Sequence, residues 1–342
     1  MKARQYQLAQ NMKTVAQLAG VSHATVSRVI NGTGLVLPKT AERVQKAIKK
    51  LGFIPNPSGA TLRYGRSKVF GLIMPDLTNP FYPEFLLNFE RTLVETDHEV
   101  MLATTQVSSP ELARSVRRML MRRVDGVVLM ASEFDTRSIE PLLDHRVPVV
   151  TIDRRTTQKG AADVAIDFET GYLQAAIHLK KLGHKRIGFI GGRAGLVTSK
   201  IRLKAFQRAL EDVGLRYDEK LTRMGDYRAA GGKSAMQSLL EPAKRPTAIM
   251  TVNDLTAFGA LRALHDANIS VPSEISIVGC DGVPLGDVFP PGLTSVAVSY
   301  EEMARKCLEA LNAVKANIEG KGPLLTVSST LVVRGSTGPA KK

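Results

Sequence analysis

Short apolar runs alternate with amphipathic helical stretches over most of the chain, and this alternation restricts the possible folds more than any other feature of the sequence. Continuous Val, Ile and Leu runs that alternate with helices are typical of parallel sheets covered on both faces. The strand-like runs are residues 69–74, 99–105, 124–130, 147–152, 186–192, 247–252 and 275–281. The helical stretches include residues 84–96, 110–122, 169–182, 199–213 and 254–267. Two such units predict an α/β body with two lobes.

The first sixty residues have helical periodicity instead. Val15, Leu18 and Ala19 follow the i, i+3, i+4 spacing of a helix. Asn11 is a suitable N-cap for this helix, and Gly20 can end it. The segment therefore predicts a short helix that stops at a tight turn.

A second short helix follows this turn, and Ser22 can cap it by accepting a hydrogen bond from the N–H of Thr25. One side of the helix is apolar and the other is small or polar: Val26, Val29 and Ile30 against Ala24, Ser27, Arg28 and Asn31. Two short helices joined by a tight turn that contains glycine predict a helix-turn-helix. In that motif the second helix lies in the major groove of DNA.

A third helix is predicted within residues 38–53. Pro38 suits its first position. Leu37 stands where Ser, Thr or Asp would cap the helix, so we expect this end to lack a side-chain cap. An apolar stripe runs along the helix: Val44, Ala47, Ile48 and Leu51.

The positive charge of the chain is concentrated in this N-terminal part. Residues 1–68 contain 12 Lys and Arg but one acid, Glu42, which gives +11 of the total net charge of +15. A basic segment on a nearly balanced body predicts a module that binds a polyanion, and nucleic acid fits best. A basic solubilising tail is the alternative, but such a tail would have low complexity and no helical periodicity.

The string TVAQLAGVSHATVSRVING, followed by PKTAERVQKAIKKLGFIPNPSGATL, resembles the DNA-binding headpiece of the LacI/GalR family of bacterial repressors. The resemblance implies that His23, Ala24 and Arg28 contact base edges. Arg can donate two hydrogen bonds to guanine, and an Ala methyl can touch a thymine methyl. It also implies a set of residues that contact phosphates or position the helix: Asn11, Ser22, Thr25, Ser27 and Asn31. Two alternatives stay open, namely that Ser22 serves purely as a cap and that Asn31 simply ends the helix.

Residues 54–62, IPNPSGATL, resemble the hinge of the same family. The resemblance implies a short helix that pairs with its copy in the minor groove, where Asn56 and Leu62 contact DNA. An apolar wedge is one way to kink a duplex, although Leu62 could instead dock on its own domain. The sequence departs from the family pattern at Gly59 and Ala60, so the hinge is expected to be less helical without DNA.

The body resembles the periplasmic-binding-protein-like core of this family over its whole length, through landmarks such as PDLTNPFYPEF and VPSEISIVGCDGVPLGDVFPPGLTSV. The expected domains are a disordered basic tail (1–10), a helix-turn-helix headpiece (11–55), a hinge (56–68), the core (69–335) and a disordered tail (336–342). Lobe 1 is predicted over 69–167 and 298–323, and lobe 2 over 168–297 and 324–335.

Polar residues at the carboxyl ends of the predicted strands predict a ligand site, because open α/β sheets bind ligands there. Asp153, Asn253 and Asp281 follow strands, and the resemblance places them with Arg202 in an effector cleft. The full set of expected effector-binding residues is Phe81, Tyr82, Asp153, Thr198, Arg202, Tyr227, Asn253 and Asp281.

Structural alternatives stay open for several of these residues. Asn253 could cap the following helix, Phe81 could pack between lobes, and Asp153 could pair with Arg154 or Arg155 at the surface. His184 is expected to have a structural role in its loop. Cys280, which neighbours Asp281, is expected to fill a strand.

These features predict a sequence-specific transcriptional regulator, a repressor, that binds operator DNA as a homodimer and responds to a small effector, with a sugar first among the candidates. No cofactor, metal or enzymatic site is expected, since the two cysteines form no CxxC pair and no P-loop or GxGxxG pattern occurs. A cytoplasmic protein without a membrane span is expected, because the N-terminus lacks the apolar stretch of a signal peptide. The alternative is a periplasmic-type sugar-binding protein or a sensor with no DNA role.

Overall fold

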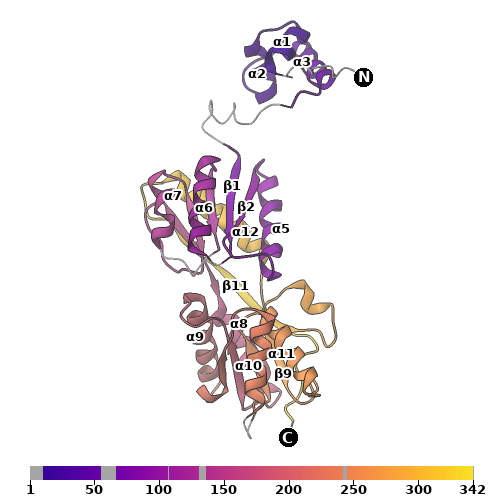
Figure 1. Cartoon of the computed structure of the whole chain (residues 1–342), viewed down its shortest axis with the longest axis vertical. Coiled ribbons are helices and arrows are strands. Elements are labelled where there is room, and N and C mark those ends of the chain that lie inside the picture. Colours follow the sequence, from indigo (N-terminus) through magenta and orange to yellow (C-terminus); the bar gives the residue numbers. More distant parts are fainter. Residues whose placement is uncertain (1–10, 55–66, 107, 131–135, 242–244, 342) are drawn as a thin grey trace, which may run out of the picture. The chain divides into compact units, whose positions relative to one another are not determined.

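The computed structural model describes residues 11–54, 67–106, 108–130, 136–241 and 245–341. The chain divides into two compact units, Met1–Ser67 and Lys68–Lys342 (Figure 1). The expected hinge contacts Asn56 and Leu62 lie outside the described residues. So does the expected N-terminal tail 1–10.

The N-terminal unit contains the three predicted helices, α1 (Met12–Ala19), α2 (His23–Asn31) and α3 (Pro38–Leu51). Asn11 caps α1, because its side chain accepts hydrogen bonds from the N–H groups of Lys13 and Thr14. Ser22 caps α2 through the N–H of Thr25 at 3.1 Å. As expected, Leu37 provides no side-chain cap for α3.

A small apolar core holds these three helices together. Val15, Val26 and Val44, one from each helix, are fully buried in it. Arg43 on α3 donates hydrogen bonds to the carbonyls of Ala19 and Gly20 at the end of α1. The turn between α1 and α2 is therefore fixed by a side chain from the third helix.

The core unit is built on one sheet whose strands run in the order β2-β1-β3-β4-β5-β11-β10-β9-β8-β6-β7. All neighbouring strands are parallel except β10 and β11, which are antiparallel. The strands are β1 (Val69–Met74), β2 (Glu99–Thr104), β3 (Gly126–Leu129), β4 (Val149–Ile152), β5 (Ala161–Asp167), β6 (Ile187–Gly191), β7 (Thr222–Met224), β8 (Ala248–Thr251), β9 (Ser276–Asp281), β10 (Thr294–Val298) and β11 (Leu324–Val332).

Helices cover both faces of this sheet, which confirms the predicted α/β class. In lobe 1, α5 and α12 pack on one face, while α6 and α7 pack on the other. In lobe 2, α8 and α9 cover one face and α10 and α11 the other. The helices are α5 (Phe81–Val94), α6 (Ser109–Met121), α7 (Glu140–Asp144), α8 (Phe168–Lys181), α9 (Val197–Asp212), α10 (Ala229–Leu240), α11 (Asp254–Asp266) and α12 (Tyr300–Ala316), with short 3-10 turns η1 (Thr136–Ile139), η2 (Glu219–Leu221) and η3 (Pro284–Asp287).

The strand β11 joins the two lobes in one sheet (Figure 1). Residues 324–328 of β11 pair with β5 of lobe 1, and its remaining residues pair with β10 of lobe 2. The expected boundary at residue 323 therefore falls too early. Lobe 1 includes the first half of β11, because this half completes the sheet of that lobe.

The C-terminal segment packs on lobe 2, so the prediction of a disordered tail is wrong for residues 336–341. Ser336 is fully buried, and its hydroxyl donates to the carbonyl of Ile277 at 2.6 Å. The carbonyl of Gly338 lies 3.0 Å from Nε2 of His184. The other ring nitrogen of His184 bonds to Thr247, which confirms the expected structural role of this histidine.

The helices α10 and α11 approach each other unusually closely at glycines. A Cβ atom at Gly259 would lie 1.9 Å from the carbonyl oxygen of Ala229, and one at Gly232 would lie 2.2 Å from that of Thr256. Only glycine permits such contact between two helix backbones. This packing fixes the N-terminal ends of both helices, where Arg228 and Asn253 lie.

Candidate functional site

The outer face of α2 is exposed at the three positions expected to contact bases. His23, Ala24 and Arg28 are exposed, whereas Val26 is completely buried. The stem of Arg28 lies beside Gly34, where a side chain would come within 3.6 Å of it. The helix therefore presents a small methyl, an imidazole and a long cation on one accessible side.

The predicted phosphate-contacting residues do not all lie on this face. Ser27 is only 6% exposed, so it lies on the inner side of α2, and its contact with phosphate stays a prediction. The reason is that α2 packs against both α1 and α3, which covers more of its circumference than one apolar stripe. The side chains of Ser22 and Asn11 are exposed but act as caps. Asn31 is the last residue of α2, and its side chain lies outside the described part of the chain.

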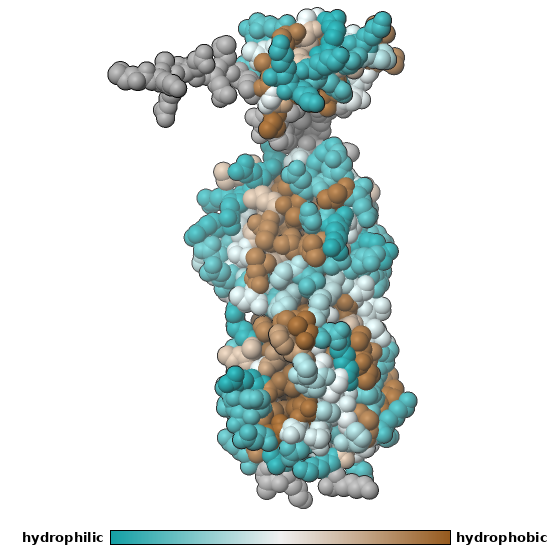
Figure 2. All heavy atoms as spheres, turned by 90° about the vertical axis from the view of Figure 1, so that its right-hand side faces the viewer, coloured by the Kyte–Doolittle hydropathy of each residue, from teal (hydrophilic) through white to brown (hydrophobic). Residues whose placement is uncertain are grey.

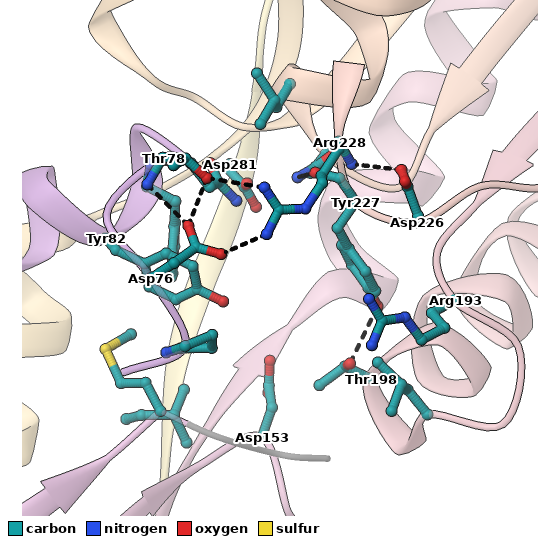
Figure 3. Close-up of a pocket in the computed structure, with 18 of the residues that line it drawn as sticks. Asp76, Thr78, Tyr82, Asp153, Arg193, Thr198, Asp226, Tyr227, Arg228 and Asp281 are labelled. Atoms are coloured by element: carbon teal, nitrogen blue, oxygen red, sulfur yellow. Dashed lines mark hydrogen bonds and ion pairs between the residues drawn. The ribbon is translucent and has the colours of Figure 1, made fainter. Parts of the chain in front are cut away.

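A cavity lies between the two lobes of the core unit, at the carboxyl ends of several strands (Figure 3). Its volume of about 120 Å³ is many times the 10–15 Å³ that one water molecule needs. All eight side chains that the sequence assigned to an effector site line this one cavity: Phe81, Tyr82, Asp153, Thr198, Arg202, Tyr227, Asn253 and Asp281.

The deepest polar pair is Arg202 with Asp281. An Nη1 atom of Arg202 on α9 lies 3.4 Å from Oδ1 of Asp281 at the end of β9, and their side chains are 8% and 3% exposed. The guanidinium also stacks over Phe168 at 4.3 Å and donates to the carbonyl of Val252. Within the described residues, Nε of Arg202 has no hydrogen-bond partner, and Oδ1 of Asp281 has none besides its ion pair with Arg202. Buried polar atoms of this kind favour a polar ligand.

Asn253 and Tyr227 connect the helices that surround the cavity. Asn253 caps α11 through the N–H of Thr256, and its Nδ2 donates to the carbonyl of Tyr227 at 3.1 Å. The hydroxyl of Tyr227 lies 3.0 Å from that of Thr198 and 2.9 Å from that of Ser199. Asn253 thus combines the capping role with a place in the cavity wall.

Asp153 is buried, which contradicts the alternative of a surface pair with Arg154 or Arg155. Its carboxylate accepts a hydrogen bond from the N–H of Ile166 at 2.7 Å. The neighbouring Asp163 accepts the backbone N–H groups of Arg154 and Arg155 instead.

Three of the cavity residues have left-handed backbone conformations that L-amino acids rarely adopt. The φ angles are 57° for Asp153, 68° for Tyr227 and 114° for Asp281. Such conformations cost about 1–3 kcal/mol each and cluster at functional sites. Phe81 lines the cavity and is buried, and its ring packs against Tyr300 of the same lobe at 5.5 Å, so this contact does not test the alternative of packing between lobes.

Sequence reasoning missed several charged or polar residues of the same cavity wall: Asp76, Thr78, Asn79, Arg193, Asp226 and Arg228. Asp76 could have been found, since it comes two residues after the end of β1 in the manner of the predicted site residues. Asp226 and Arg228 follow β7, a strand of three residues with a polar sequence. Strand periodicity cannot reveal such a short strand.

Burial raises the pKa of several carboxyl groups in this region, including Asp163. The pKa of Asp281 is raised to about 8, against the opposing charge of Arg202, and that of Asp153 to about 6. The pKa of Asp254, beside the cavity, is raised to about 7 by burial. Asp254 accepts hydrogen bonds from Ser295 and from the N–H of Val283, so it holds the loop after β9.

These shifts predict that the core unit loses stability as the pH rises from 6.5 to 8. A carboxyl with a raised pKa binds its proton more tightly in the folded chain, so folding is favoured while that proton is present and disfavoured as it leaves. Asp254 and Asp281 lose their protons in this window. Burial lowers the pKa values of His178 and His184, so near pH 6.5 the unfolded chain binds more protons at these histidines than the folded chain does. This opposes the effect of the carboxyl groups, but it fades as the pH rises above about 6.5, the ordinary pKa of histidine.

Urea unfolding of the full chain at constant ionic strength measures this effect. The free energy of unfolding should decrease with pH by up to about 1.4 kcal/mol per unit for each group that titrates. The Asp254→Asn and Asp281→Asn variants should each show a flatter profile than the parent chain. A stability that stays constant or rises across this window would contradict the assigned shifts.

The described residues contain no group of three or more His, Cys, Asp and Glu side chains that could hold a metal ion. In that same part of the chain, no helix has the length and apolar character needed to cross a membrane.

Family comparisons match both units. Residues 11–56 match the description "Bacterial regulatory proteins, lacI family", and residues 176–337 match a periplasmic binding protein-like domain. The HTH-type transcriptional repressor PurR of Actinobacillus pleuropneumoniae serotype 3 (strain JL03) is 34% identical over 306 residues, which cover 88% of this chain and 89% of that protein. CytR, an HTH-type transcriptional repressor of Escherichia coli (strain K12), is 31% identical over 340 residues, 98% of this chain and 99% of CytR.

Solved structures of transcriptional regulators are also similar to this chain. The transcriptional regulator CelR in complex with cellobiose has a TM-score of 0.72 and 32% identity, over 95% of this chain and 99% of CelR. The Lac repressor dimer bound to operator and an anti-inducer has a TM-score of 0.84 at 24% identity, over 96% of this chain and 99% of that one, which shows a shared fold. The headpiece match, together with relatives above 30% identity along nearly the whole length, shows that this chain belongs to the lacI family of bacterial regulatory proteins.

Proposed function

We propose that this chain is a sequence-specific transcriptional repressor whose affinity for an operator is changed by a small effector in the interlobe cavity. One observation carries the proposal: the eight side chains that the sequence predicts for an effector site all line this cavity. The first unit of the same chain exposes His23, Ala24 and Arg28, the residues expected to contact bases. Such a regulator acts on the chromosome and therefore in the cytoplasm.

On the DNA side, Arg28 would donate to guanine and Ala24 would contact a thymine methyl. His23 would contact a base acceptor or a phosphate. The concentration of positive charge in residues 1–68 would add phosphate contacts, so operator affinity should fall steeply with salt through counterion release. Ser22, Thr25 and Asn11 would position α2 on the DNA.

We further propose that the repressor acts as a homodimer on a pseudo-palindromic site. The core unit carries exposed large apolar side chains, and Figure 2 shows apolar groups on one of its faces in both lobes. Among the exposed residues are Leu87 and Val94 on α5 and Leu285, Val288 and Phe289 at or after η3. Exposed apolar patches often mark contacts between proteins.

The effector is proposed to be a sugar or a related small metabolite. Arg202, Asp281 and Asn253 combine donors and acceptors, which suits the hydroxyl groups of a sugar. Phe81 and Tyr82 add aromatic faces to the same wall. A ligand that prefers one closure state of the lobes would change operator affinity, and operator DNA would change ligand affinity by the same factor.

A thermal-shift screen of the full chain tests this proposal, with monosaccharides, disaccharides, sugar phosphates and nucleosides as probes. A ligand at 100 times its Kd should stabilise the chain by about 2.7 kcal/mol. Each compound that stabilises the chain is then added to a titration of DNA with protein, where operator affinity should change. If no compound of these classes stabilises the chain, the proposed effector class is wrong.

A further inference from the structure

Arg228 links the two lobes directly across the mouth of the cavity (Figure 3). It lies between β7 and α10 in lobe 2, whereas Asp76 and Thr78 follow β1 in lobe 1. Its Nη2 atom is 2.9 Å from Oδ2 of Asp76, and its Nη1 atom is 3.3 Å from the hydroxyl of Thr78. The guanidinium thus bonds to two side chains of the opposite lobe.

The lobe 1 side of this contact is preorganised. The other carboxylate oxygen of Asp76 accepts the N–H of Thr78 at 2.8 Å and its hydroxyl at 2.6 Å. Partial burial raises the pKa of Asp76, but the Thr78 hydrogen bonds and the charge of Arg228 outweigh it and hold the pKa below its ordinary value. Asp76 therefore stays charged at neutral pH and points one oxygen at Arg228.

The lobe 2 side is fixed by three separate contacts. Asp226 accepts the backbone N–H of Arg228 at 2.9 Å. Tyr227 has a left-handed φ of 68°, its hydroxyl bonds to Thr198 on α9, and its carbonyl accepts from Asn253 at the start of α11. Segment 226–228 is therefore attached to the same helices that form the wall of the cavity.

We propose that Arg228 and Asp76 form a latch that holds the two lobes together over the cavity. Arg228 is then a positioning residue for the response to a ligand. A ligand that touches Tyr227, Thr198 or Asn253 shifts segment 226–228 and so strengthens or weakens the latch. This last step rests on the proposed effector site, whereas the latch itself does not.

The expected strength of the latch suits a reversible switch. The side chains of Arg228 and Asp76 are 48% and 21% exposed, so water and salt weaken their attraction. A partly exposed ion pair of this kind changes an equilibrium by about two- to fivefold. Small ligands can readily supply that much preference for one state of the lobes.

Pulsed electron paramagnetic resonance can measure the distance between the lobes in the full chain without DNA or ligand. Spin labels are attached at Arg117→Cys on α6 of lobe 1 and Lys204→Cys on α9 of lobe 2, both exposed positions. Cys280 and Cys307 are buried and should not react. An excess of unlabelled protein keeps labels on different copies apart.

Arg228→Ala should raise the ratio of long to short distances about two- to fivefold. Asp76→Asn should shift the ratio in the same direction, and the double variant should go no further than Arg228→Ala, because Arg228→Ala already removes both bonds to lobe 1. High salt should lengthen the distances in the parent chain but have little further effect in the variants. Arg228→Lys, which keeps the charge, should restore part of the short population.

Lys233→Ala is the matched control. It breaks the ion pair of Lys233 with Asp266, in which the nitrogen and oxygen are 2.7 Å apart and the side chains are 38% and 31% exposed. This pair is about as exposed as the latch, but it joins α10 and α11 within lobe 2. This variant should leave the distances unchanged. An unchanged distribution in Arg228→Ala, or additive effects of Arg228→Ala and Asp76→Asn, would overturn the latch. Because no ligand is present, either result leaves the proposed function to be decided by the ligand screen.

Discussion

Above pH 8, where Asp281 is charged, the Arg202→Ala variant is expected to lose about 3–5 kcal/mol of unfolding free energy, because it breaks a buried ion pair and leaves Asp281 without its cation. It also removes the stacking of the guanidinium on Phe168 and its hydrogen bond to the carbonyl of Val252. Urea unfolding above pH 8 measures the loss.

Two further results would identify the cause of this loss. Without Arg202 the pKa of Asp281 should rise above about 8, so the deficit should grow as the pH rises beyond that value. Any compound that stabilises the parent chain in the screen should fail to stabilise the variant. Lys200→Ala, which removes an exposed cation from the same helix, is the control and should change stability by less than about 0.5 kcal/mol.

Arg202→Met separates packing from charge in this site. The Met side chain keeps an apolar stem against Phe168, so part of the stability should return while the ligand response stays lost. A loss below about 1 kcal/mol in Arg202→Ala together with a normal ligand response would contradict the role given to the Arg202–Asp281 pair.

The Arg28→Ala variant is expected to weaken binding to the preferred operator by about 1–3 kcal/mol, roughly 5- to 150-fold, and to relax the base preference at one position in each half-site. Fluorescence anisotropy with the operator and with single-base variants of it measures both effects. Since Arg28 is exposed on α2, the stability of the N-terminal unit should be unchanged.

An exposed lysine of the same unit provides the control. Lys49→Ala lies on α3 and should affect all DNA sequences alike, if at all, with no change in base preference. An equal loss of affinity on every sequence in Arg28→Ala would show that Arg28 contacts phosphate, and would refute its base-contacting role.

The sequence was a good guide to structure wherever one element carries its own periodic pattern. The run VFGLIM became β1 with both ends as predicted, and the caps at Asn11 and Ser22 were also found. The strands β5, β7, β10 and β11 were not among the predicted runs. β7 has three residues, and three of the four residues at 326–329 in β11 are Thr or Ser, which interrupts its apolar run.

Some residues of the candidate site could be predicted from the sequence and others could not. Asp153, Asn253 and Asp281 follow apolar strands, and the rule for the carboxyl ends of strands predicts them. Arg228 follows a strand that sequence cannot reveal, and its link to Asp76 depends on how the lobes meet. The C-terminal residues 336–341 likewise have no periodicity, and they are ordered by hydrogen bonds to distant backbone such as that of Ile277.

In vitro selection of binding sites by the full chain from a pool of random DNA duplexes tests the central claim most directly. The proposed function predicts that an inverted repeat is enriched, with half-sites related by two-fold symmetry and their centres about one helical turn, or a multiple of it, apart. The Arg28→Ala chain should then enrich a repeat with one relaxed position per half-site. Recovery of unenriched random sequences by the parent chain would contradict the claim that α2 specifies an operator.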